Sequence, residues 1–169
     1  APYDCPKSKL IFEQGCEALA LKMEENPESG HPITRSLNGL ALLASGNPEY
    51  LPIVREQVEL VSTFSDPERK NLHSWSYGYI NMLVAEYTMA TGDHTFMSDL
   101  ERLTMEIVNG QSEVGSWGHR FIQGENGRLS GYGMMNAPGL PLTVSLILAR
   151  EAGVQETKLD DAIAKNALL

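Results

Sequence analysis

The residues best suited to bind or transform a polar ligand are gathered in one glycine-rich stretch, residues 111–137. Two aromatic side chains there, Trp117 and Tyr132, offer flat apolar faces. Three further side chains offer directional hydrogen bonds: His119, Arg120 and Asn136. Glycines around them allow tight turns and close approach of the backbone. Since long ordered connections in compact proteins are uncommon and often functional, the stretch predicts a lined pocket.

Two uses of this stretch stay open from the residues alone. An enzyme acting on an acidic sugar would need a base and a group that stabilises an anion. The predicted catalytic residues for that use are His119, Arg120 and Tyr132. As a structural device, Trp117 and Phe121 would instead anchor the stretch on the helices, with Arg120 bound to carbonyls at a helix end.

A second group of candidate ligand contacts lies earlier in the chain, where His73, Trp75 and Tyr77 alternate. His73 could carry a proton or be a hydrogen-bonded core histidine. Glu86 interrupts an apolar face and must be paired if it is buried, and Arg120 is a candidate partner. The predicted ligand-binding set is His73, Trp75, Tyr77, Glu86, Trp117 and Asn136.

Helices must position these residues, because apolar side chains recur at three and four residues and no alternating strand pattern survives. Capping residues, prolines and glycines divide the pattern into about seven helices, with Ser8 expected to cap the first and Asp93 the fifth. The sixth is expected to open at Pro138 or Leu140. The expected ranges are 8–25, 33–45, 48–64, 74–91, 93–109, 138–153 and 156–169. The sequence therefore predicts an all-α fold.

A unit of helix, glycine and second helix recurs three times, at Gly46, Gly92 and Gly153. The first two glycines stand 46 residues apart, and Tyr50 and Phe96 keep the same offset. The third unit is displaced because the glycine-rich stretch intervenes. Such units are antiparallel helical hairpins, which stack into an open solenoid or a closed ring.

The helix over 74–91 is expected to be sandwiched between other parts of the protein. At 100° per residue, one of its sides carries His73, Tyr77, Ile80 and Val84. The opposite side carries Trp75, Tyr79, Met82 and Glu86. A helix with aromatic and apolar groups on both sides is an inner helix, covered by its hairpin partner on one side and facing a cavity or a neighbour on the other.

Size and composition bound the function. With 169 residues and 42% hydrophobic side chains, the chain predicts a single helical domain over residues 1–169. Its net charge of −9 repels phosphates and anionic lipids, so no nucleic acid and no membrane partner is expected. Two cysteines, Cys5 and Cys16, are too few for a zinc site, and no metal or cofactor is predicted. Unpaired thiols are expected, with a disulfide between them as the alternative.

The run Gly115-Ser116-Trp117-Gly118 after a helix, together with the hairpins, resembles the α/α-toroid proteins, which include terpenoid cyclases, protein prenyltransferases and several polysaccharide lyases. Residues 73–79, 115–121 and 131–139 are similar to an uncharacterised bacterial family with a toroid-like domain. The resemblance covers 71–153, roughly half of the chain, and implies a fold rather than an activity. The chain departs from the cyclases, because Asp160 and Asp161 lie in an ordinary amphipathic helix, and from the prenyltransferases, whose zinc ligands it lacks.

Toroids of this group usually close with five to seven hairpins, and about three are present here with one opening helix. We therefore predict an incomplete ring that is part of a longer toroid-like domain, whose uncovered apolar surface favours self-association or a partner domain. The favoured function is binding of a small polar ligand or oligosaccharide. The alternatives are a carbohydrate-active enzyme of lyase or glycosidase type and a structural repeat that docks a protein. Localisation stays open, with an extracytoplasmic (periplasmic or secreted) site favoured over a cytoplasmic one.

Overall fold

A computed structural model describes residues 5–70, 72–123 and 133–168. Within these ranges the chain forms seven α-helices, one short 3-10 turn and no strand, so the predicted all-α class is confirmed. The helices are α1 (Pro6–Glu25), α2 (Pro32–Ala44), α3 (Leu51–Ser62), α4 (His73–Thr91), α5 (Met97–Asn109), α6 (Asn136–Glu151) and α7 (Thr157–Asn166), with η1 (Pro48–Tyr50) leading into α3.

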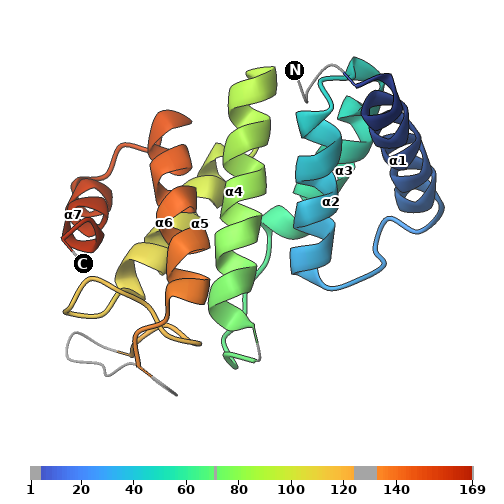
Figure 1. Cartoon of the computed structure of the whole chain (residues 1–169). Helices are drawn as coiled ribbons and strands as arrows, with labels where there is room; N and C mark the ends of the chain where they lie inside the picture. Colours follow the sequence, from blue (N-terminus) through green and yellow to red (C-terminus); the bar gives the residue numbers. More distant parts are fainter. Residues whose placement is uncertain (1–4, 71, 124–132, 169) are drawn as a thin grey trace.

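The helices form two rows (Figure 1). In the front row, α2, α4 and α6 lie side by side and run in the same direction, with α4 in the middle. Behind them α3 and α5 return in the opposite direction, and α7 lies beside α6 at one flank, so that each front helix is followed by a helix that packs against it. α1 packs on α2 and α3 at the other flank. Short turns favour such antiparallel neighbours.

The three repeated glycines occupy equivalent places in these hairpins. Gly46, Gly92 and Gly153 each follow a front-row helix with φ values of 69°, 69° and 112°. Side chains other than glycine rarely adopt this left-handed region, so glycine is required where the chain leaves the helix and turns back. Tyr50 and Phe96 are both the N-cap residues of the helices that follow, α3 and α5. The repeat seen in the sequence is thus a repeat of local structure.

Several helix boundaries differ from the predicted ones. Ser8 does not cap α1, because Pro6 already lies in its first turn and Cys5 is the N-cap residue. Asp93 does not begin α5. Its carboxylate instead accepts hydrogen bonds from the Thr95 backbone N–H at 3.0 Å and from the Tyr87 hydroxyl at 2.9 Å. These bonds tighten the α4–α5 turn and delay the helix to Met97. α6 begins at Asn136 rather than at Pro138.

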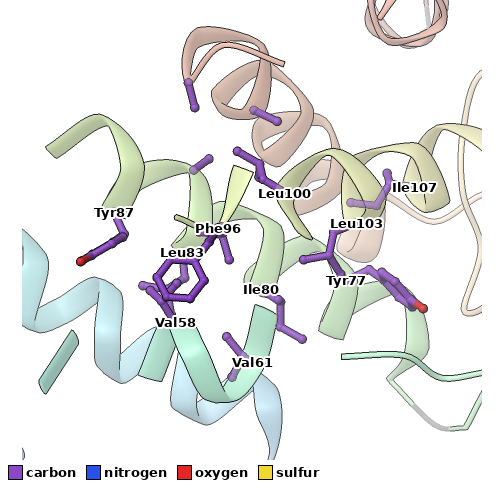
Figure 2. Close-up of a cluster of buried hydrophobic side chains, with 14 of the residues drawn as sticks. Val58, Val61, Tyr77, Ile80, Leu83, Tyr87, Phe96, Leu100, Leu103 and Ile107 are labelled. Carbon is purple, nitrogen blue, oxygen red and sulfur yellow. The ribbon is translucent and has the colours of Figure 1, made fainter. Parts of the chain in front are cut away.

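The core lies between the two rows, where side chains from α3, α4 and α5 converge (Figure 2). On α4, His73, Tyr77, Ile80 and Val84 are buried, whereas Trp75, Tyr79, Met82 and Glu86 are half-buried. The predicted two-sided character of this helix is therefore confirmed. α4 and α6 approach closely at Gly78, where an added Cβ would lie 3.4 Å from the Leu142 backbone nitrogen.

Candidate functional site

The connection that follows α5 crosses the beginning of α4. The Ser74 N–H donates to the His119 carbonyl at 3.4 Å, and the Ile122 N–H donates to the Gly110 carbonyl at 3.1 Å. The Arg69 guanidinium donates to the Phe121 carbonyl at 3.0 Å. This part of the connection is therefore fixed against both α4 and the α3–α4 loop, and its side chains cover the first turn of α4.

A cavity of about 480 Å³ opens where the first turn of α4 meets the last turn of α5. We call it the Asp66 cavity. Its lining comes from the α3–α4 loop, α4, α5 and the crossing connection, and it is mostly polar: Ser65, Asp66, Pro67, Arg69, His73, Tyr77, Glu106, Asn109, Gly110, Phe121, Ile122 and Gln123. Ligand sites typically have volumes of about 300–1,000 Å³.

Asp66 and His73 form the central polar pair of this cavity. The His73 Nδ1 lies 2.9 Å from the Asp66 Oδ2, and the two side chains are only 4% and 10% exposed. Because a carboxylate only accepts hydrogen bonds, Nδ1 carries the proton and Nε2 keeps a lone pair. Burial lowers the pKa of His73, and the Asp66 carboxylate only partly opposes this shift. The imidazole is therefore neutral at physiological pH.

The second nitrogen of His73 has no hydrogen-bond partner among the described residues. Nε2 is buried, and the Phe121 ring lies with its centroid 4.6 Å from the imidazole centroid. A buried acceptor without a donor is costly, and such a group in a native structure points to a missing partner. His73 is thus an acceptor available to a donor that the described residues do not provide.

Tyr77 joins this pair from the next turn of α4. Its hydroxyl accepts a 3.4 Å hydrogen bond from the Asp66 backbone N–H. Burial, together with a hydrogen bond to the Glu106 carboxylate, raises the pKa of Tyr77 well above its usual range, so it stays a neutral phenol. Its ring contacts those of His73 and Phe121 at centroid distances of 5.0 Å each. The cavity therefore combines aromatic walls with both donors and acceptors.

Sequence reasoning missed several members of this site, among them Asp66, Arg69 and Glu106. Asp66 lies in the loop between α3 and α4, and its place beyond the end of a helix gives no sign in the sequence that its side chain turns toward the next helix. Arg69 and Leu72 adopt left-handed φ values of 51° and 64°, which non-glycine residues rarely show and no sequence pattern announces. Glu106 follows the charged pattern of an ordinary amphipathic helix, in which it pairs with Arg102 at 3.0 Å.

Trp117 lies in the core and does not offer an open stacking face. Its side chain is fully buried, and its indole N–H donates to the Ile107 carbonyl of α5 at 2.9 Å. The Met135 N–H donates to the Trp117 carbonyl at 3.1 Å, which ties the start of α6 to the same point. The anchoring role, which was the alternative for Trp117 and Phe121, is the one that this geometry favours.

The other predicted residues are divided between two faces. Trp75 is half-buried on the front of α4, with its ring centroid 5.2 Å from that of His119. Arg120 is exposed, and Asn136 is exposed at a separate cavity of about 400 Å³ with Ser116, Thr143 and Asn166. Tyr132 lies outside the described residues. The catalytic roles of His119, Arg120 and Tyr132 stay predictions.

Glu86 is half-buried and lies thirteen residues beyond His73 on α4. At 1.5 Å per residue, about 20 Å separates the two along the helix axis. The connection carrying Arg120 crosses α4 at Ser74, so the expected ion pair between Arg120 and Glu86 within the chain is not formed.

Other chemistry is sparse in the described ranges. They contain no group of three or more His, Cys, Asp or Glu side chains placed to hold a metal ion. Their helices all fall short of the length and apolar content needed to cross a membrane. Cys5 and Cys16 are both free thiols, the first exposed and the second buried.

A family model described as "Domain of unknown function (DUF6288)" matches residues 8–169. The chain belongs to the DUF6288 family. The match includes α2 to α7 and all of α1 except its first two residues, and so the Asp66 cavity and the crossing connection lie within the family domain. No curated protein and no solved structure matches the chain.

Proposed function

We propose that this DUF6288 domain binds a polar, hydroxyl-rich ligand of the carbohydrate class in the Asp66 cavity. The observation that carries the proposal is the buried His73 Nε2, which is held as an acceptor by Asp66 and has no donor among the described residues. A ligand hydroxyl would supply the missing donor. Since Nε2 is buried and the Phe121 ring contacts the imidazole, binding requires side chains around Nε2, such as Phe121, to shift.

The composition of the cavity supports this ligand class. A sugar presents hydroxyls, which both donate and accept hydrogen bonds, and flat C–H faces, which pack on aromatic rings. The cavity offers the Glu106 carboxylate, the Asn109 and Gln123 amides, and the Tyr77 and Phe121 rings. Arg69 adds a cation whose guanidinium is already oriented by its bond to the Phe121 carbonyl.

The same proposal includes the architecture. Parallel front helices backed by antiparallel return helices are what a segment of an α/α-toroid or a helical solenoid would contain. In either assembly, the cavity would open at the end where the front helices begin. Further hairpins or a partner domain would then add residues to the ligand site from the neighbouring units.

The test is a binding screen against neutral and acidic oligosaccharides, followed by calorimetry with the best ligand. Glu106→Gln should weaken binding at least tenfold and Asn109→Ala about fivefold, since a lost hydrogen bond to a charged group is worth about 1.5–3 kcal/mol and a neutral one about 1 kcal/mol. Glu101→Gln is the matched control, because Glu101 is exposed on α5 and does not line the cavity. Thermal melts check that each variant is folded.

A direct readout comes from the His73 ring. Ligand binding should move its Nε2 nitrogen resonance, because the lone pair would accept a hydrogen bond, while the exposed His94 should not respond. Binding that is unaffected by both cavity variants, or the absence of any oligosaccharide that binds, would contradict the proposal.

A further inference from the structure

The front row of helices carries apolar side chains that the rest of the described chain covers only in part, as where His119 lies against Trp75. We call it the front face: the side of α2, α4 and α6 turned away from α3 and α5. Along α4 it consists of side chains spaced by three and four residues, all half-buried: Trp75, Tyr79, Met82 and Glu86. This spacing places them in one stripe, on the side of α4 opposite the core.

The neighbouring helices extend this stripe. Leu37 of α2 is 45% exposed, and on α6 Leu140 is 68% exposed, with Val144 and Ile147 each 37% exposed. Single exposed apolar residues are normal on protein surfaces, but a patch that spans adjacent helices marks an interaction surface. The front face is such a patch, and Glu86 is the one acidic member of its α4 stripe.

Charges at the two ends of the front face indicate which partner fits. At the beginning of α4 the crossing connection brings His119 against Trp75, and the exposed Arg120 follows it. Glu86 lies eleven residues after Trp75, about 16 Å along the helix axis. The face is thus basic at one end, apolar in the middle and acidic toward the other end. Such a pattern is complementary to itself after a rotation of 180°.

We propose that two copies of this chain pair through their front faces about a two-fold axis. The axis passes between Tyr79 and Met82, the middle of the stripe, so that α4 lies antiparallel to α4 of the second copy. Arg120 of each copy then lies near Glu86 of the other, and the apolar side chains of α2 and α6 cover the centre. This pairing is independent of the ligand proposed for the Asp66 cavity.

The first test is the oligomeric state of the whole chain, measured by sedimentation and light scattering from 1 to 200 µM. We expect a monomer–dimer equilibrium. Leu140→Asp and Tyr79→Asp should each weaken dimerisation at least tenfold, because each places a carboxylate in the apolar interface. Leu140 is far enough exposed that its variant should fold normally. Ile11→Asp is the control, since Ile11 is equally exposed but lies on α1.

The second test addresses the two-fold geometry. Arg120→Glu and Glu86→Arg should each weaken the dimer, and the double variant should restore it because the charges are exchanged. In a Cys5→Ser background, Met82→Cys should form a disulfide between copies under mild oxidation, whereas Ile11→Cys should not.

Three results would overturn the proposal: a monomer at 200 µM, a dimer that resists both aspartate variants, or a charge exchange without restoration. The first would favour another occupant of the front face, such as a further domain. The second would place the dimer contact elsewhere, and the third would exclude the antiparallel arrangement.

Discussion

The imidazole of His73 donates from Nδ1 to the Asp66 carboxylate over 2.9 Å, and so joins the first turn of α4 to the loop that precedes it. Asp66 Oδ2 also accepts the Lys70 N–H at 2.9 Å, which closes the loop on itself. One carboxylate therefore orders the loop and orients the histidine at the same time.

The neutral state of His73 predicts a dependence of stability on pH. Because burial lowers its pKa in the folded protein, the unfolded chain binds a proton more readily, near the ordinary pKa of 6.5. The free energy of unfolding should therefore be highest above pH 6.5 and fall below it, by at most about 1.4 kcal/mol per pH unit. Urea denaturation between pH 8 and pH 5 measures this slope.

The control for this slope is a pair of histidine variants. His73→Asn keeps a donor for Asp66 but does not titrate, so it should flatten the slope between pH 6.5 and pH 5. His94→Gln removes an exposed histidine and should leave the slope unchanged. An equal slope in wild type and His73→Asn would show that another group is responsible.

Trp117 is expected to matter for stability rather than for ligand contact. Trp117→Phe keeps a buried ring but leaves the Ile107 carbonyl without its donor, so the free energy of unfolding should fall by about 1–3 kcal/mol. Trp75→Phe, at a half-buried position, should cost less than about 1 kcal/mol. Denaturation followed by circular dichroism compares the two variants. If Trp117→Phe is as stable as the wild type, the assignment of Trp117 as an anchor is contradicted.

A side chain at position 110 is predicted to destabilise the fold because it would clash with Phe121, not because the backbone there requires glycine. Its φ of −85° is ordinary, but an added Cβ would lie 2.3 Å from the Phe121 Cγ. Gly110→Ala should destabilise the protein by about 1–3 kcal/mol, and Phe121→Leu in the same chain should recover part of the loss. Gly15→Ala, in the exposed middle of α1 with nothing within 4 Å, should instead stabilise it by about 0.5–1 kcal/mol.

The α4–α5 turn offers a prediction at low pH. Hydrogen bonds from Thr95, and then from Tyr87, lower the pKa of Asp93 to about 2. Its contribution to stability is therefore complete above the ordinary value of 3.8 and is lost as the pH falls toward 2. Asp93→Asn should lower the melting temperature at pH 7 by about 2–5 °C, and the difference should shrink between pH 3.8 and pH 2. A constant difference would contradict this assignment.

The sequence predicted the scaffold better than the site. Helical periodicity and glycine punctuation are local signals, and they gave the seven helices, the hairpin turns at Gly46, Gly92 and Gly153, and the two sides of α4. Those signals also showed that His73 and Trp75 face opposite ways. The start of α5 was misplaced because the Asp93 side chain accepts hydrogen bonds within the turn instead of capping the helix, one of them from the Tyr87 hydroxyl of the preceding helix.

The site depended on contacts between elements, which composition does not encode. A tryptophan in a glycine-rich stretch can either line a pocket or pack into the core, and the sequence does not distinguish the two. The hydrogen bond from the Trp117 indole to the Ile107 carbonyl shows that it packs into the core. The sequence does not show that Asp66 pairs with His73. The loop brings them together through left-handed backbone conformations at Arg69 and Leu72, and no sequence pattern marks those conformations. Residues 111–137 were predicted to line a pocket; in their described part, Phe121, Ile122 and Gln123 line the Asp66 cavity, whereas Trp117 does not.

The common direction of α2, α4 and α6 divides the connections of this molecule between two rims. The segments 26–31 and 63–70 and the described part of the connection before α6 lie at the rim where the front helices begin. The turns that leave the front row, 45–50, 92–96 and 152–156, each contain a glycine with a left-handed φ. Protein engineers can thus treat the two rims differently. Grafted peptides or altered loop lengths belong in residues 26–31, which enter the front row without lining the Asp66 cavity. The exit rim should be left as the frame that holds the hairpins in register.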